Sequence, residues 1–287
     1  MVISGKELAA KLKAEMAEEV KSFPGKYGRV PHLVVILVGN DPGSQTYVRN
    51  KEKACDVVGF KHTTYRMPEE TSENEVLDKI TELNADDSVD GILVQLPLPG
   101  HISETKVIET ISKDKDVDGF HPLNTAALWQ KRPNDTCVVP CTPMGIIKLL
   151  EAADYEIAGK RAVVLGRSQI VGLPVSKLLL DRNATVTICH SRTKNLTEIT
   201  RQADILVAAI GKAKFVTGDM VKEGAAVIDV GMDLDENGKL CGDVDFVSVE
   251  PKASVITPVP GGVGPMTICC LMSNTIRCFL NKMLYKE

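Results

Sequence analysis

Three polar side chains fall at helical spacing near the start of the stretch DPGSQTYVRNKEKA, residues 41–54. Asp41 suits the N-cap position and the proline after it suits the first helical position, so a helix is predicted to begin here. Ser44, Tyr47 and Lys51 then share one face, a hydroxyl, a phenol and an amine that together could position a substrate and move protons. A solvated helix face explains the same pattern, because most lysines are exposed.

Two more polar residues stand in segments where an apolar residue or a simple turn is expected. Gln95 lies inside the strand-like run GILVQLPLP, and a buried amide must find hydrogen-bond partners. Asp118 precedes Gly119 in KDVDGFHP, where an Asp-Gly turn is an adequate explanation by itself. Taken singly, each residue has an ordinary structural explanation.

A glycine turn between a strand and a helix predicts a nucleotide site in the second half of the chain. In RAVVLGRSQIVGLPVSKLLL, Gly166 permits a tight turn, Ser168 is small enough for a phosphate to approach, and Gly172 allows close packing of helix on strand. The usual G-x-G-x-x-G pattern is lengthened here to G-x-S-x-x-x-G, and a turn without a ligand is the alternative.

The residues after the next strand bear on which dinucleotide would bind. An NAD site usually places an Asp or Glu there for the ribose hydroxyls, whereas this chain has His190, Ser191, Arg192 and Thr193. A hydroxyl and a guanidinium bind a 2′-phosphate that an acid would repel, and Arg167 is a second candidate. NADP is therefore favoured over NAD, with solvated loop residues as the alternative.

The elements that must position these groups follow an α/β rhythm. The chain has 287 residues, and near-continuous apolar strands alternate with helices almost from end to end, which is typical of parallel sheets covered on both faces. The rhythm breaks between residues 120 and 143. We therefore predict a first domain over 1–140, a second over 141–264, and a C-terminal segment 265–287 whose apolar helix packs back on the first domain.

Composition excludes several classes of protein. The net charge of −4 without a long basic run makes nucleic acid and anionic membranes poor partners. No apolar run is judged long enough to span a bilayer, and the N-terminus lacks a signal-peptide or transit-peptide pattern, so a cytoplasmic protein is expected. The eight cysteines form no C-x-x-C pair, which predicts reduced thiols and neither a zinc site nor a disulfide framework.

Eight segments acquire a joint meaning when they are considered in order. They are GSQTYVRNK, GILVQLPLP, KDVDGFHPLN, PCTPMG, GRSQIVGLP, CHSRT, VIDVG and TPVPGGVGPMT, and they span nearly the whole chain. Together they closely resemble the bifunctional 5,10-methylenetetrahydrofolate dehydrogenase / 5,10-methenyltetrahydrofolate cyclohydrolase family. The resemblance implies an N-terminal catalytic domain, a C-terminal Rossmann-type NADP-binding domain, a cleft between them, and a homodimer acting on tetrahydrofolate one-carbon derivatives.

The resemblance also implies roles for individual residues. Lys51 would be the principal catalytic residue, Tyr47 would position or stack on the folate, Gln95 would hydrogen-bond Lys51, and Asp118 would hold the pterin ring. The implied folate site comprises Tyr47, Lys51, Val94, Gln95, Leu96, Asp118, Pro260, Gly261, Gly262 and Pro265. The implied NADP site comprises Gly166, Arg167, Ser168, Ser191, Arg192 and Met232, the last lining the nicotinamide side, and no metal is implied.

The chain departs from the family at Ala126 and Ala127, where Gly-Arg is common after HPLN. This departure bears on loop geometry or cofactor contacts and leaves the catalytic set intact.

Lysine can act in general acid–base catalysis only if part of it is uncharged. The pKa of a free lysine is about 10.4, and burial beside an apolar wall without a carboxylate partner would favour the neutral amine of Lys51. Gln95 could orient that amine without stabilising the ammonium as an acid would. Two other interpretations use the same layout: an NADP-dependent dehydrogenase of another small substrate, of shikimate type, and a non-catalytic nucleotide-binding module.

Overall fold

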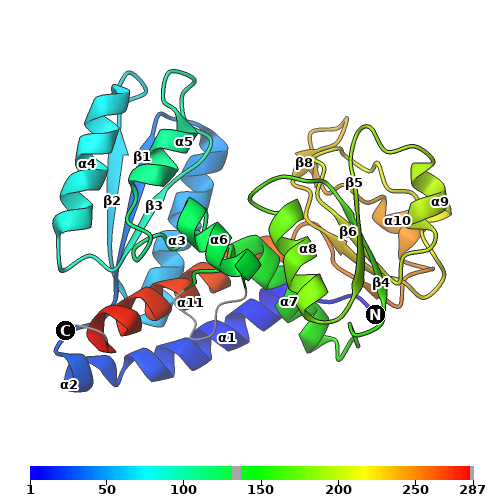
Figure 1. Ribbon diagram of the computed structural model, residues 1–287, viewed down its shortest axis with the longest axis horizontal. Coiled ribbons are helices and arrows are strands. Elements are labelled where there is room, and N and C mark those ends of the chain that lie inside the picture. Colours follow the sequence, from blue (N-terminus) through cyan, green and yellow to red (C-terminus); the bar gives the residue numbers. More distant parts are fainter. Residues whose placement is uncertain (131–136, 285–287) are drawn as a thin grey trace. The chain divides into compact units, whose positions relative to one another are not determined.

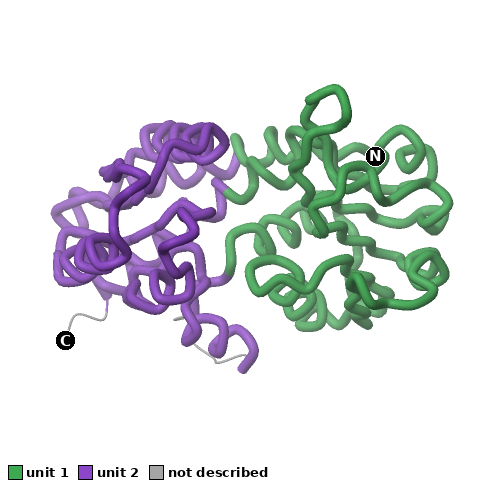
Figure 2. Tube along the Cα trace, turned by 90° about the horizontal axis from the view of Figure 1, so that it is seen from above, with its two compact units in different colours: residues 1–10, 140–267 green, residues 11–139, 268–287 purple. Residues whose placement is uncertain are grey.

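The computed structural model describes residues 1–130 and 137–284, and this part of the chain forms two compact units. Unit 1 contains residues 1–10 and 140–267, and unit 2 contains residues 11–139 and 268–287 (Figure 2). Both are α/β units with parallel sheets, as predicted (Figure 1). The sequence-based division had placed residues 1–10 in the first domain. They belong to unit 1 because Ile3 N donates to Ile256 O and Lys6 N to Gly261 O, both at 2.9 Å.

Unit 2 is built on a three-stranded parallel sheet in the order β2-β1-β3. Every residue of β1 is buried, and its Val35 is level with Thr64 of β2 and Leu93 of β3. The strands are β1 His32–Val38, β2 Lys61–Met67 and β3 Gly91–Val94. The helices are α2 Phe23–Tyr27, α3 Pro42–Val58, α4 Glu73–Ala85, α5 Glu104–Thr110 and α6 Pro122–Gln130.

Helix α3 begins and ends at residues that the local sequence specifies. The carboxylate of Asp41 accepts a hydrogen bond from Ser44 N at 2.7 Å, which confirms the predicted N-cap. The helix ends at Gly59, whose φ of 86° is the left-handed conformation that glycine adopts most readily. The residues between these ends include the buried Val48 and Lys51, so the helix presents a lysine on the same side as apolar packing residues.

Two helices contribute residues to both units: α1 Gly5–Val20 and α11 Val263–Leu284. Within unit 2, Phe279 of α11 is fully buried and stacks on Phe23 with ring centroids 5.3 Å apart. By length and mean hydropathy, 1.3 over 18 residues, α11 could span a membrane, although 61% of that window is buried. The expectation that no apolar run is long enough to span a bilayer was therefore wrong. Asn274 and Thr275 interrupt the apolar residues in the sequence, but the helix continues through them.

Unit 1 is built on a five-stranded, all-parallel sheet in the order β10-β7-β6-β4-β5. Strand order reverses at β4, because β5 lies on one side of it and β6 on the other. This is a doubly wound, Rossmann-type sheet, whose switch point is where ligands bind outside the carboxyl ends of the strands. The strands are β4 Arg161–Leu165, β5 Thr185–Cys189, β6 Ile205–Ala208, β7 Ala226–Asp229 and β10 Val255–Ile256.

The remaining elements of unit 1 are helices and one hairpin. The helices are α7 Cys141–Ala152, α8 Gly172–Asp181, α9 Leu196–Thr200, α10 Phe246–Val249 and the 3-10 turn η1 Gly218–Met220. Strands β8 Asp233–Leu234 and β9 Leu240–Cys241 pair antiparallel. All eight cysteines lie in the described part of the chain, seven of them buried and Cys137 half-buried.

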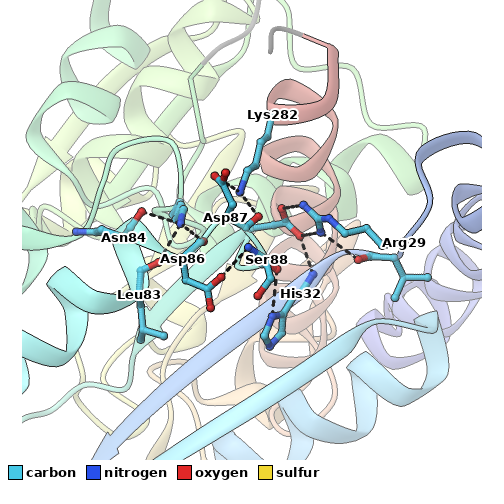
Figure 3. A network of polar contacts seen from close by, with 11 residues as sticks. Arg29, His32, Leu83, Asn84, Asp86, Asp87, Ser88 and Lys282 are labelled. Carbon is cyan, nitrogen blue, oxygen red and sulfur yellow. Dashed lines mark hydrogen bonds and ion pairs between the residues drawn. The ribbon is translucent and has the colours of Figure 1, made fainter. Parts of the chain in front are cut away.

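A polar network lies where β1 and β3 of unit 2 begin (Figure 3). Arg29 Nη1 and Nη2 donate to the two carboxylate oxygens of Asp90 at 2.5 and 2.7 Å, and the Asp90 side chain is fully buried. His32 N donates to the same carboxylate at 2.9 Å, and the guanidinium of Arg29 lies 4.9 Å from the ring centroid of Phe279. The network thereby joins strand β1, the residue before β3, and helix α11.

Replacing Arg29 with methionine is expected to lower the free energy of unfolding of unit 2 by about 3–5 kcal/mol, because Asp90 would keep a buried charge without its bidentate partner. The urea midpoint of a unit 2 probe measures the effect. Lys21→Ala is the matched control, since its ion pair with Glu18 is 68% and 73% exposed and should change stability by about 1 kcal/mol or less. Equal midpoints for both variants would contradict the expectation.

Candidate functional site

Lys51 and Gln95 are joined by a direct hydrogen bond in unit 2. Lys51 Nζ donates to Gln95 Oε1 at 2.9 Å, and the lysine is only 8% exposed. Gln95 Nε2 donates to Leu96 O at 2.6 Å, which fixes the orientation of the carboxamide and turns its oxygen toward the amine. The predicted pair is therefore formed, and the Lys51 face of α3 is not a solvated surface.

Gln95 does not lie inside a strand, as the sequence had suggested. Strand β3 ends at Val94, and Gln95 is the next residue, although its backbone N–H still bonds Ile36 O at 2.8 Å. The side chain therefore leaves the sheet at its carboxyl end, the edge where parallel sheets carry their ligand-binding groups. The buried run GILV continues into QLPLP, where Leu96 and Leu98 keep the apolar pattern. The predicted strand was therefore too long.

Asp118 is carried to the same edge by a short parallel pairing. Asp116 bridges Ile92, and Ile92 N donates to Lys115 O at 2.8 Å, so the turn that carries Asp118 begins beside β3. Val117 is fully buried, and its carbonyl oxygen accepts a hydrogen bond from Asn274 of α11 at 2.9 Å. Gly119 follows with a φ of 75°, which confirms the predicted turn.

The Asp118 carboxyl is electrostatically coupled to Lys51. Burial raises the pKa of Asp118 to about 6, the nearby Lys51 ammonium lowers it, and Asp116 raises it further. Lys51 thus has a carboxyl group near it, so only the burial half of the condition that favours its neutral amine is met. Asp118 also lines a small cavity together with Val94, Leu96 and Phe120.

Tyr47 lies one turn before Lys51 on α3, on the face predicted for it. It is half-buried, and burial raises the pKa of its phenol. Ser44, a turn earlier, is buried, and its backbone N–H donates to the N-cap residue Asp41, so it has a structural role there. The structure therefore brings Lys51, Gln95 and Asp118 together at one edge of the unit 2 sheet, with Tyr47 on the adjoining helical turn.

The glycine turn of unit 1 has the close approaches that the motif predicts. Gly166 follows β4 with a φ of 115°, and a Cβ there would lie 2.1 Å from Ala209 O. A Cβ on Gly172 would lie 2.3 Å from Gly166 O, so the first residue of α8 packs against the backbone of the turn without room for a side chain. Ser168 Oγ accepts hydrogen bonds from Val171 N and Gly172 N at 3.2 and 3.3 Å, which orders the turn.

Ser191 and Arg192 stand beside that turn. Strand β5 ends at Cys189, whose carbonyl oxygen accepts a hydrogen bond from Gly166 N at 2.9 Å, so the two loops leave adjacent strands at the switch point. Ser191, Arg192 and Arg167 are exposed. Exposed hydroxyl and guanidinium groups next to a glycine turn suit the phosphates of a dinucleotide.

The remaining predicted residues lie in unit 1, Met232 and residues 260–262 in loops and Pro265 in the first turn of α11. Met232, 50% exposed, follows β7, and its sulfur would lie 3.9 Å from a Cβ on Gly264. Gly261 has a φ of 105°, and a Cβ on Gly5 would lie 1.9 Å from Gly262 O, so this backbone packs closely on the start of the chain. The predicted folate residues of this region are Pro260, Gly261 and Gly262 of the loop and Pro265 of α11, and all four belong to unit 1.

Asp116 was not singled out from the sequence. It is 3% exposed, and its carboxylate accepts hydrogen bonds from Gly119 N at 3.1 Å, His121 N at 2.8 Å and Asn124 Nδ2 at 2.9 Å. It therefore holds the turn that carries Asp118. The signal in the sequence was the first acid of D-V-D-G, two residues before the predicted Asp-Gly turn, because Asp side chains bond nearby backbone N–H groups in turns.

Among residues 1–130 and 137–284, no group of three or more His, Cys, Asp or Glu side chains could hold a metal ion. The polar groups that the site of unit 2 presents are an amine, an amide, a carboxyl and a phenol. The departure at Ala126 and Ala127 falls within α6.

Comparisons with known proteins agree on one family. Residues 3–118 match the family model for the tetrahydrofolate dehydrogenase/cyclohydrolase catalytic domain, and residues 140–283 match that for its NAD(P)-binding domain. The chain is 54% identical over 279 residues to the bifunctional protein FolD of Streptococcus agalactiae, a match that covers 97% of both chains.

Two solved structures show the same agreement. The bifunctional enzyme FolD of Campylobacter jejuni is similar with a TM-score of 0.95 and 49% identity, over 98% of this chain and 99% of that one. The Trypanosoma brucei N5,N10-methylenetetrahydrofolate dehydrogenase-cyclohydrolase, complexed with NADP cofactor and inhibitor, is similar with a TM-score of 0.93 and 40% identity, over 98% and 97% of the two chains.

Proposed function

The chain belongs to the tetrahydrofolate dehydrogenase/cyclohydrolase family, and we propose that it oxidises 5,10-methylenetetrahydrofolate with NADP and hydrolyses the resulting 5,10-methenyltetrahydrofolate to 10-formyltetrahydrofolate. The observation that carries the proposal is the buried Lys51 amine, held by the Gln95 carboxamide at 2.9 Å beside Asp118. The shikimate-type alternative leaves the matches of both halves of the chain to folate-family models unexplained.

The first reaction mainly requires alignment. Loss of hydride from the carbon between N5 and N10 leaves a cation that both nitrogens stabilise, so the protein need not donate a proton. Asp118 accepts hydrogen bonds from the pterin ring, and Tyr47 packs on the ring from helix α3. Bound NADP supplies the hydride acceptor.

The second reaction requires a group that moves protons. Water adds to the methenyl carbon of the cationic substrate, and the tetrahedral adduct opens at the C–N5 bond. Of the two protons that the water gives up, one must reach the departing N5 and the other is released to solvent. Lys51 serves as the general acid–base, because its Nζ is buried and directed by a neutral acceptor. Gln95 orients Lys51. Val94 and Leu96, the neighbours of Gln95 in the sequence, form the apolar wall that limits solvent access to the amine.

The residues of unit 1 fit a dinucleotide phosphate. The cradle at Gly166 and Gly172 has no room for a Cβ at either glycine, and backbone N–H groups gather where α8 begins. Arg167, Ser191 and Arg192 would hold the 2′-phosphate, and Ser168 would order the turn beneath the pyrophosphate. Met232, the loop residues Pro260, Gly261 and Gly262, and Pro265 at the start of α11 would line the nicotinamide and folate sides.

Ser191→Asp is expected to raise the KM for NADP about tenfold or more while the KM for NAD changes about threefold or less, because a carboxylate repels the 2′-phosphate that NAD lacks. Steady-state oxidation of 5,10-methylenetetrahydrofolate with each cofactor measures both constants. Ser191→Ala, which removes one hydroxyl without adding charge, is the control and should raise the NADP value only a fewfold. Equal rises for the two cofactors would refute the assignment.

The proposed assembly is a homodimer acting in the cytoplasm. The dimer rests on the family resemblance, and the location rests on the reduced thiols predicted from the sequence. Light scattering on the purified chain tests the dimer.

A coupled assay on one purified sample tests the proposed function itself. With 5,10-methylenetetrahydrofolate and NADP, we expect NADPH to form, and with 5,10-methenyltetrahydrofolate alone we expect 10-formyltetrahydrofolate above the uncatalysed rate. Absence of both products with NADP and with NAD would favour the non-catalytic nucleotide-binding module. NADP turnover with a different small substrate only would favour the other dehydrogenase class.

A further inference from the structure

The loops that leave β6 and β7 of unit 1 emerge side by side. The two strands pair in parallel with Ala208 level with Asp229, the last residue of each. In a doubly wound sheet the ligand lies outside these carboxyl ends. We propose that Asp229 and Asp243 are positioning residues that together set the loops after β6 and β7 for the nicotinamide half of the cofactor, an inference that rests on the proposed function.

Asp229 fixes the chain on both sides of the β8–β9 hairpin. Its side chain is buried, and Oδ1 accepts hydrogen bonds from Gly231 N at 3.0 Å and Asp243 N at 2.9 Å. Its other oxygen, Oδ2, accepts a hydrogen bond from Val244 N at 3.0 Å. One carboxylate at the end of β7 therefore holds both the residue before Met232 and the segment that follows the hairpin.

Asp243 extends this connection to the loop after β6. It is fully buried, and its two carboxylate oxygens accept hydrogen bonds from Ile210 N at 2.7 Å and Lys212 N at 2.6 Å. That loop also touches the phosphate turn, since a Cβ on Gly166 would lie 2.1 Å from Ala209 O. The contacts thus form a continuous series from Gly166 through Asp243 to Asp229 and the backbone beside Met232.

Two glycines of this region leave just enough space for the two carboxylates and their backbone donors. A Cβ on Gly231 would lie 2.3 Å from Asp243 N, and a Cβ on Gly242 would lie 2.0 Å from Asp229 Oδ2. A side chain at either glycine would displace a carboxylate from the backbone N–H groups that donate hydrogen bonds to it. The backbone that leads into Met232 is therefore shaped around the acid pair.

Five backbone N–H groups compensate the charge of the pair. Burial raises the pKa of Asp229 to about 7, its three backbone donors lower it, and Asp243 raises it. The titratable groups that face this cluster from neighbouring segments include Asp233, whose pKa is raised by burial and by Asp243, and Cys241 and Lys214. An amide in place of either acid presents an NH₂ group to a backbone N–H, and that contact cannot form a hydrogen bond.

Asp243→Asn is expected to raise the KM for NADP about tenfold, because one of its two contacts to the β6 loop is lost. The kcat/KM for 5,10-methenyltetrahydrofolate hydrolysis, which uses no cofactor, should change less than about twofold. Asp229→Asn, which can keep the two contacts made through Oδ1, should show the same split more weakly and serves if Asp243→Asn does not fold.

Asp204→Asn is the matched control. Asp204 also accepts a backbone hydrogen bond, from Arg161 N at 2.9 Å, but it immediately precedes β6 and so lies at the opposite end of the sheet. This variant should leave the KM for NADP unchanged. A proportional loss of both activities in Asp243→Asn, or an unchanged KM for NADP, would overturn the positioning role.

Equilibrium binding of NADP, measured by calorimetry, separates this inference from the proposed function. Weaker binding in Asp243→Asn and wild-type binding in Asp204→Asn would support the positioning role even if the chain oxidised no folate. Equal NADP affinity in wild type and Asp243→Asn would overturn it even if both folate reactions occurred.

Discussion

The Lys51→Met variant is expected to hydrolyse 5,10-methenyltetrahydrofolate about 10³-fold more slowly than the wild type while it continues to transfer hydride at a measurable rate. A positioned general acid–base contributes about 10²–10⁴-fold to such a step, and methionine fills the space of the lysine stem without a proton to exchange. Hydride transfer creates a cation that the folate nitrogens stabilise, so it depends on alignment more than on the amine.

The two rates of Lys51→Met should be measured separately, by methenyl hydrolysis without cofactor and by NADPH formation from the methylene substrate. Lys53→Met is the control, because Lys53 is an exposed lysine two residues further along α3 and should retain both rates within about twofold. Survival of full hydrolysis in Lys51→Met would refute the catalytic role. Equal loss of both reactions would instead assign Lys51 to substrate binding.

The Asp118→Asn variant is expected to lose about 10²-fold in kcat/KM for both folate reactions. The ionised carboxylate can accept charge-assisted hydrogen bonds from the pterin, whereas an asparagine offers one neutral acceptor and an NH₂ group. Asp114→Asn is the matched control, since Asp114 is an exposed carboxylate in the same segment and should leave kcat/KM within about twofold.

The pH dependence of Asp118 has a definite sign. Because burial raises its pKa to about 6, the carboxylate is progressively protonated as the pH falls through 6, and kcat/KM of the wild type should fall with it. The amide that replaces this carboxyl in Asp118→Asn does not titrate, so the acidic limb should disappear from the profile of the variant. An acidic limb that persists unchanged in Asp118→Asn would exclude Asp118 as its origin.

Local sequence patterns predicted the elements that position the site well. The Asp41 cap, the shared face of Tyr47 and Lys51, and the glycine turn at Gly166 depend on neighbouring residues, and all three are confirmed. The parallel α/β architecture of both units was also predicted, because buried parallel strands give apolar runs that are easy to detect.

Contacts between residues far apart in the sequence were the features that sequence reasoning missed. The placement of residues 1–10 in unit 1 depends on backbone bonds such as Ile3 N to Ile256 O, which no local pattern encodes. The carboxylates of Asp116 and Asp243 accept hydrogen bonds mainly from backbone N–H groups, and these donors carry no residue-specific signal. The approach of Asp118 to Lys51 likewise depends on the pairing of Asp116 beside Ile92.

A crystal structure of the chain with a bound folate analogue tests most directly where the chemistry takes place. The account predicts that the pterin ring lies against the Asp118 carboxylate and that Lys51 Nζ is within hydrogen-bond distance of the position of the one-carbon bridge. A folate analogue bound elsewhere, with Lys51 and Gln95 still paired and untouched, would contradict it.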